Sequence, residues 1–107
     1  MPMLEGVPEV LRPLLPELAV SLGEYLVQAG QALARGDSLV AAEAAHAVKG
    51  AAMYYKLPAM ADAAAKFEAQ CRMLAGGDIS AKALERARQA LAAAGGELEA
   101  LRAELKA

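Results

Sequence analysis

Three short breaks divide this sequence into four segments, each with a helical pattern of apolar residues. The breaks are Gly36-Asp37, Leu57-Pro58 and Gly76-Gly77. A glycine commonly ends an α-helix, and the residue before a proline is pushed out of the α region. Between the breaks, apolar residues recur at spacings of three and four, as they do on one face of a helix. The pattern therefore predicts four helices, over about 14–35, 38–54, 58–75 and from about 80 to the end.

Each predicted helix has one apolar stripe that we expect to face the core. The first stripe is Leu11, Leu15, Leu18, Leu22, Tyr25, Ala29 and Ala32, and the second is Ala41, Ala44, Val48, Ala51 and Tyr55. The third is Leu57, either Met60 or Ala61, Ala64, Phe67, Cys71 and Leu74, and the fourth is Leu84, Ala87, Leu91, Ala94, Leu98, Leu101 and Leu105. Because Pro13 and Pro16 cannot lie deep inside a helix, we expect a short entry helix before Pro13. The pair Gly95-Gly96 costs roughly 2 kcal/mol relative to two alanines, which predicts a bend or a weak point there.

The fold class that follows is all-α: an antiparallel up-down-up-down four-helix bundle with a short extra N-terminal helix. Short connections make neighbouring helices antiparallel. Alanine and leucine, both strong helix formers, dominate the chain, and no run of alternating β-branched residues suggests a strand. With 107 residues, the chain has the length of one domain, which we assign to residues 1–107. Four apolar stripes can close on one another, which favours a monomer.

Composition argues against several classes of function. The net charge is −2 with both signs interspersed, and aromatic residues make up only 4% of the chain, so no nucleic-acid surface is indicated. No apolar run is long enough to span a membrane, and the N-terminus lacks the pattern of a signal peptide. One cysteine forms no internal disulfide, so a cytoplasmic location is the expectation. A single histidine and a single cysteine give no ligand cluster for zinc or di-iron.

The only histidine, His46, lies opposite the apolar stripe of the second predicted helix, so we expect its imidazole to be exposed. Residues three, four or seven positions away share its face. They are Leu39, Ala42, Glu43, Lys49, Gly50 and Met53. A neutral exposed imidazole is a usable nucleophile near pH 7. Lys49 places a cation one turn away, and Gly50 leaves room for a second protein to approach.

The segment His46-Ala47-Val48-Lys49-Gly50-Ala51-Ala52 resembles the signature of histidine phosphotransfer (HPt) domains: histidine, any residue, an aliphatic residue, lysine, glycine and small residues. The segment 55–60 resembles the family's turn into the next helix, and Phe67-Glu68 resembles its later hydrophobic-acidic pair. The predicted bundle and the chain length also match the family. Only the region 46–60 is specific, since the rest is a general helix pattern.

The resemblance implies a phosphocarrier of a bacterial two-component phosphorelay. His46 would be the phosphoryl acceptor, forming phosphohistidine, while Lys49 would stabilise the phosphoryl group and Gly50 would give clearance. The implied partners are response-regulator receiver domains and a hybrid sensor histidine kinase. No cofactor of its own is implied, and Mg²⁺ is expected on the partner receiver domain. The chain has no Gly-rich phosphate loop, so we expect a carrier without its own ATP site, not an enzyme.

The docking surface implied by the resemblance combines apolar and polar residues around His46. We assign Leu39, Ala42, Glu43, Met53 and Tyr54 to partner binding. Glu43 is also a candidate to hydrogen-bond the other imidazole nitrogen and fix its tautomer, although a solvated glutamate is the more common case.

Two positions depart from the family pattern. Val48 replaces the usual leucine or isoleucine, which is a minor change of volume. Lys56 stands where the family usually has glycine, so a left-handed turn there would cost roughly 1–2 kcal/mol. A differently shaped turn, with Pro58 enforcing the break, is the other option.

Two other functions fit parts of the sequence. A non-catalytic helical adaptor or dimerisation module would use the long stripe from Leu84 to Leu105 to pair with another chain. A dimerisation-and-phosphotransfer fragment of a kinase usually has an acidic residue directly after the histidine, where this chain has Ala47.

Overall fold

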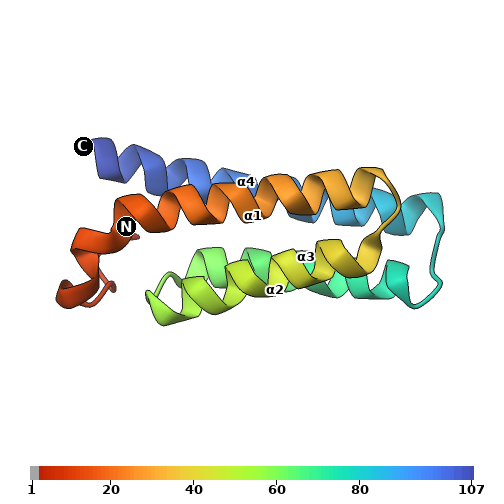
Figure 1. Cartoon of the computed structure of the whole chain (residues 1–107), viewed down its shortest axis with the longest axis horizontal. Helices are drawn as coiled ribbons and strands as arrows, with labels where there is room; N and C mark the ends of the chain where they lie inside the picture. The colour runs from red at the N-terminus through yellow and green to blue at the C-terminus, as the bar shows by residue number, and fades with distance from the viewer. Residues whose placement is uncertain (1–2) are drawn as a thin grey trace.

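The computed structural model describes residues 3–107 and is an all-α bundle. A 3₁₀ helix, η1 (Glu9–Leu14), precedes four α-helices (Figure 1). These are α1 (Leu15–Ala34), α2 (Ser38–Tyr54), α3 (Pro58–Ala75) and α4 (Ala81–Lys106). The four predicted helices and the short entry helix are confirmed, and no strand occurs among residues 3–107. η1 contains Pro13, and Pro16 lies in the first turn of α1, where its missing N–H has no helical partner to lose.

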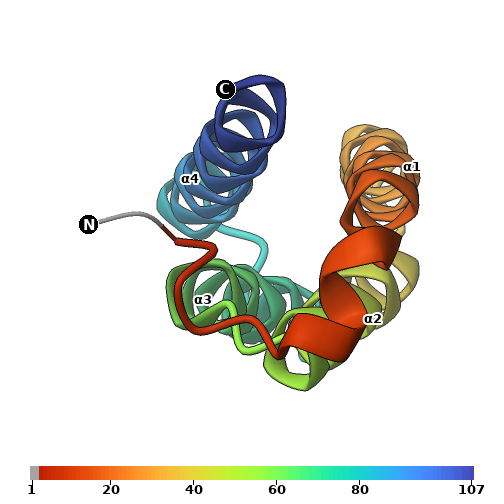
Figure 2. The same cartoon turned by 90° about the vertical axis from the view of Figure 1, so that its left-hand side faces the viewer.

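Consecutive helices run antiparallel along a rod of 43 × 21 × 19 Å (Figure 1). Seen end-on, α2 and α3 lie side by side, α1 packs on α2, and α4 packs on α3 (Figure 2). Among the four pairs of neighbouring α-helices, α1 and α4 have the smallest contact, so the bundle is partly open between them. None of these described helices has both the length and the apolarity that a membrane-spanning segment requires.

The core follows the predicted stripes with one correction. Leu22, Leu57, Met60, Phe67 and Leu101 are completely buried. Tyr25, which we expected in the first stripe, is 37% exposed, and Leu26 is buried in its place. The buried positions of α1 continue from Leu22 by a step of four rather than three, which turns the Tyr25 side chain outward.

The long apolar stripe of α4 is used within the bundle. Leu98 and Leu101 belong to the core, and Leu91 and Leu105 pack against it as half-buried residues. The stripe that suggested a dimerisation module thus covers its own α1 and α3. α4 continues as one helix through Gly95-Gly96, where the sequence predicts a bend or a weak point.

Three of the helices end in the same hydrogen-bonded turn, in which the first residue after the cap is left-handed. At α1 this residue is Gly36 with φ of 81°, and at α3 it is Gly77 with φ of 110°. At α2 it is Lys56 with φ of 59°, where the Leu57 N–H donates to the Ala52 carbonyl at 2.8 Å. This is the Schellman arrangement, and it satisfies carbonyls that the helix end leaves unpaired. Of the two options for this turn, the structure therefore has the left-handed lysine.

Candidate functional site

His46 lies midway along α2 with its side chain 62% exposed, as the sequence predicts. The opposite side of α2 is filled by Ala41, Ala44 and Val48, which are buried in the bundle. Since these short side chains let α1 and α3 approach closely, α2 keeps only a narrow exposed face. The imidazole stands on that face.

A carboxylate from the neighbouring helix holds one side of the imidazole. The Nδ1 atom of His46 lies 3.1 Å from Oε2 and 3.4 Å from Oε1 of Glu68 on α3. An ionised carboxylate accepts hydrogen bonds and donates none, so Nδ1 must carry the proton in this contact. The neutral ring then has its lone pair on Nε2. This assignment of the tautomer follows from the hydrogen-bond network.

Two cations also hold Glu68, whose side chain is only 9% exposed. The ammonium of Lys49 lies 3.0 Å from Oε1. The guanidinium of Arg72 donates to Oε2 from Nε at 3.0 Å and from Nη2 at 2.7 Å. Burial raises the pKa of Glu68, but the hydrogen bonds from Arg72 and Lys49, together with the charge of Lys49 and that of the His46 ring when it is protonated, outweigh it. The pKa of Glu68 therefore lies below its ordinary value, and the group is a carboxylate at neutral pH.

Lys49 is on the same side of α2 as His46, one turn further along. Both side chains reach Glu68, so the ammonium and the imidazole flank one carboxylate. The Lys49 side chain is 30% exposed, so a group bound at Nε2 from solvent has a cation close by. The structure thus places the imidazole of His46 and the ammonium of Lys49 close together, and Glu68 is the group that contacts both.

The surface beside His46 is bare at Gly50 and apolar around it. A Cβ built on Gly50 meets no atom within 4 Å, so the position opens to solvent. The other exposed neighbours were all expected on this face: Leu39 (54% exposed), Met53 (60%) and Tyr54 (68%), with Glu43 also exposed.

Ala42 is wrongly assigned to partner binding, because its exposure is 0%. The buried arc of α2 is wider than one stripe, since the helix packs against both α1 and α3. Ala45 is buried for the same reason. The contact to Nδ1 comes from Glu68 and not from Glu43, the residue considered for it from the sequence.

Glu68 and Arg72 are the site residues that sequence reasoning missed. The family resemblance includes Phe67-Glu68 only as a hydrophobic-acidic pair and gives the glutamate no role. A sharper signal was available, because Glu68 lies four residues after Ala64 and three before Cys71, both on the apolar stripe of α3. A charged residue on a core stripe must find partners, and Arg72 follows it at the i+4 spacing that favours an ion pair.

The remaining candidates for chemistry lie elsewhere or are inert. Cys71 is buried, and burial raises the pKa of its thiol to about 11, so it is no nucleophile at neutral pH. Within the part of the chain that the structure describes, no group of three or more His, Cys, Asp or Glu residues is arranged to hold a metal ion.

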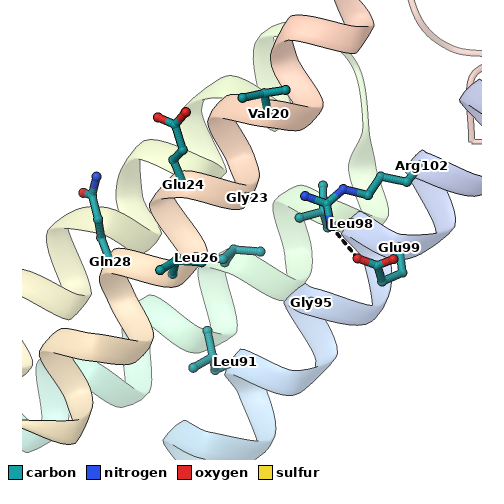
Figure 3. A pocket seen from close by; sticks show the side chains of 11 residues that line it. Val20, Gly23, Glu24, Leu26, Gln28, Leu91, Gly95, Leu98, Glu99 and Arg102 are labelled. Carbon is teal, nitrogen blue, oxygen red and sulfur yellow. Dashed lines mark hydrogen bonds and ion pairs between the residues drawn. The ribbon is translucent and has the colours of Figure 1, made fainter.

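A groove of about 710 Å³ lies between α1 and α4, on the open side of the bundle (Figure 3). Leu26, Leu91 and Leu98 line it, and Gly95 lies on its wall. None of the lining residues belongs to α2 or α3, so the groove does not include His46.

Comparison with known proteins agrees with the site. Searches of curated proteins and of solved structures gave no match. A family model described as "Hpt domain" matches residues 13–107, a range that covers all four α-helices and includes His46, Lys49 and Glu68. With most of its length matched by this model, and with an exposed histidine in the middle of a four-helix bundle, the chain belongs to the Hpt domain family, whose members carry phosphoryl groups on histidine in phosphorelays.

Proposed function

We propose that this chain is a phosphocarrier that takes a phosphoryl group on Nε2 of His46 from the aspartate of one receiver domain and passes it to the aspartate of another. The observation that carries the proposal is the exposed imidazole whose Nδ1 donates to a nearly buried carboxylate. That contact leaves the Nε2 lone pair directed away from Glu68. Family membership supports the same assignment.

The transfer follows from this geometry. The Nε2 lone pair attacks the phosphorus of the receiver's aspartyl phosphate, the P–O bond breaks, and the aspartate leaves as a carboxylate with the bonding electrons. Nδ1 keeps its proton, so the phosphorylated ring becomes cationic. The carboxylate of Glu68, 3.1 Å from Nδ1, stabilises that charge. Transfer to the second receiver is the reverse reaction.

The other site residues act on the phosphoryl group and on the partner. The ammonium of Lys49 neutralises part of the phosphoryl charge, since positioning and electrostatics dominate phosphoryl transfer. Gly50 gives the receiver clearance above α2. Leu39, Met53 and Tyr54 supply apolar contact around it. Mg²⁺ bound to the receiver provides further charge stabilisation on its side of the interface.

The wider role that we propose is that of a carrier in a bacterial two-component phosphorelay. The chain would act in the cytoplasm as a monomer, between a hybrid sensor histidine kinase and its response regulators. It would take phosphoryl groups from receivers and not from ATP.

The direct test uses receiver domains labelled with ³²P from acetyl phosphate. Mixed with this chain, the cognate receiver should transfer label that is stable in alkali and lost in acid, as expected for phosphohistidine. The His46→Gln variant should stay unlabelled, with unchanged helix content by circular dichroism. Label that persists in this variant would rule out His46 as the acceptor. Wild-type chain that no receiver labels would contradict the proposed function as a whole.

A further inference from the structure

The carboxylate of Glu68 is held at its two oxygens by two different cations. Arg72 donates two hydrogen bonds to Oε2, at 2.7 and 3.0 Å, while Lys49 donates to Oε1 at 3.0 Å. The two cations come from different helices: Arg72 is on α3 and Lys49 is on α2. Oε2 is therefore satisfied without Lys49.

This arrangement resolves a conflict in the role of Lys49. In the resting structure its ammonium is bound to Glu68, yet in the proposed reaction it must serve the phosphoryl group on Nε2. Without Arg72, turning Lys49 away would leave the carboxylate of Glu68, which is 9% exposed, with only the Nδ1–H of a neutral imidazole as its partner, which is unfavourable. With Lys49 as its sole cationic partner at rest, Glu68 would compete with the phosphoryl group for that lysine.

We infer that Arg72 is a positioning residue for phosphotransfer: it anchors the Glu68 carboxylate so that the Lys49 ammonium can turn to the phosphoryl group. This inference rests on the proposed function. Arg72 itself touches neither Nε2 nor the phosphoryl group, and it acts through Glu68 and Lys49. The long lysine side chain, 30% exposed at α2, needs only rotamer changes to move from Oε1 to a group on the outer side of the ring.

The charges balance before and after transfer. At rest, one carboxylate faces two cations, Lys49 and Arg72, beside a neutral imidazole. After transfer, Arg72 and the cationic ring remain on Glu68, and Lys49 faces the doubly negative phosphoryl group. Each anionic group then has a cationic partner. Arg72 is the cation that holds Glu68 before the ring has become cationic, while Lys49 turns to the incoming phosphoryl group.

A double-mutant cycle tests the coupling. Phosphoramidate, a small donor whose P–N bond is broken as ammonia leaves, phosphorylates histidine without any receiver and so removes docking effects. Arg72→Ala should slow phosphorylation of His46 about tenfold, the effect of losing one charge-assisted interaction. In a Lys49→Met background, the same change should alter the rate less than twofold. Arg72→Lys, which keeps the charge, should restore part of the rate.

Matched controls separate positioning from folding and docking. Arg86→Ala removes an exposed arginine from α4 and should leave the rate unchanged. With the receiver as donor, Arg72→Ala should lower the maximal rate while the receiver Kd stays within twofold. Proton exchange at the Lys49 ammonium, followed by ¹⁵N NMR, should slow in Arg72→Ala because Lys49 then binds Glu68 more firmly.

The possible results are distinct. An equal loss of rate in both backgrounds, or no loss in either, would overturn the role of Arg72 while leaving His46 as the carrier. A raised Kd with an unchanged maximal rate would make Arg72 a docking residue and would also overturn it. Wild-type chain that neither phosphoramidate nor a receiver phosphorylates would instead overturn the proposed function, and the inference with it.

Discussion

Replacing Gly50 by alanine should make the protein more stable and less able to bind its partner. Gly50 lies inside α2, where glycine costs up to about 1 kcal/mol relative to alanine. A Cβ at this position meets no atom within 4 Å, so the new methyl group causes no clash within the chain. Gly50→Ala should therefore raise the free energy of unfolding by about 1 kcal/mol, which corresponds to roughly 4–5 °C in Tm for a domain of this size.

The same methyl group should obstruct a receiver that approaches His46 closely. Forcing one extra methyl into a packed contact costs about 1–3 kcal/mol, which weakens binding roughly 5- to 150-fold. Thermal unfolding by circular dichroism measures the first effect. Titration calorimetry with the cognate receiver domain measures the second, together with the rate of ³²P transfer to His46.

Two glycines in α4 provide matched controls. Gly95 and Gly96 are also inside a helix, and a Cβ on either meets no atom within 4 Å. Neither is on α2 or α3, so alanine there should give the same gain in stability without any change in receiver binding. If Gly50→Ala bound and exchanged phosphoryl groups like the wild type, the clearance assigned to Gly50 would be wrong. If Gly50→Ala lowered Tm while the two control substitutions raised it, the conclusion that the space above Gly50 is open would be wrong.

Three further predictions concern the rest of the structure. Lys56→Gly should stabilise the protein by roughly 0.5–1 kcal/mol. Glycine removes the steric cost of a left-handed lysine, and the greater freedom of the unfolded chain offsets part of that gain. A lower Tm would show that the lysine side chain makes a compensating contact. Glu68→Gln should be less stable than wild type at neutral pH, by roughly 1–2 kcal/mol in urea titrations. Because folding lowers the pKa of Glu68, its carboxylate stabilises the fold at any pH above the ordinary glutamate pKa. The difference in stability between wild type and Glu68→Gln should therefore vanish as the pH falls through the lowered pKa. A difference in stability that persists in acid would refute its ion-pair origin. The thiol of Cys71, with its pKa raised to about 11, should react with Ellman's reagent at pH 8 only as fast as the protein unfolds, and rapid labelling of the native protein would contradict its burial.

The fold could be predicted from the sequence because its signals are local. Gly36 and Gly77 end helices through their own backbone conformation, and Pro58 begins one. The boundaries of α2 and α3 agree with the predicted ranges because each lies between such signals. The exposure of His46 also followed from local spacing, since the opposite face of α2 carries the apolar residues.

The part of the site that lies between helices could not be predicted in the same way. Spacing along α2 says nothing of which α3 residue lies across from His46, and that register brings Glu68 to Nδ1. Ala42 was misplaced because a helix packed on two sides buries a wider arc than a single stripe. Tyr25 was misplaced because spacings of three and four fit the sequence equally well after Leu22, and only packing decides between them.

Two residues near the C-terminal end of α2 are poor choices for stability: Gly50 lies inside the helix, and Lys56 follows its end. Gly50 weakens a helix that alanine would strengthen, and Lys56 occupies a left-handed position that suits glycine. Exchanging the two residue types would improve both positions, so folding alone does not explain their distribution. Local conflicts of this kind gather where function makes a separate demand. Under the proposed function, the demand at Gly50 is room for a partner, whereas Lys56 is exposed and nothing in the structure explains a lysine there.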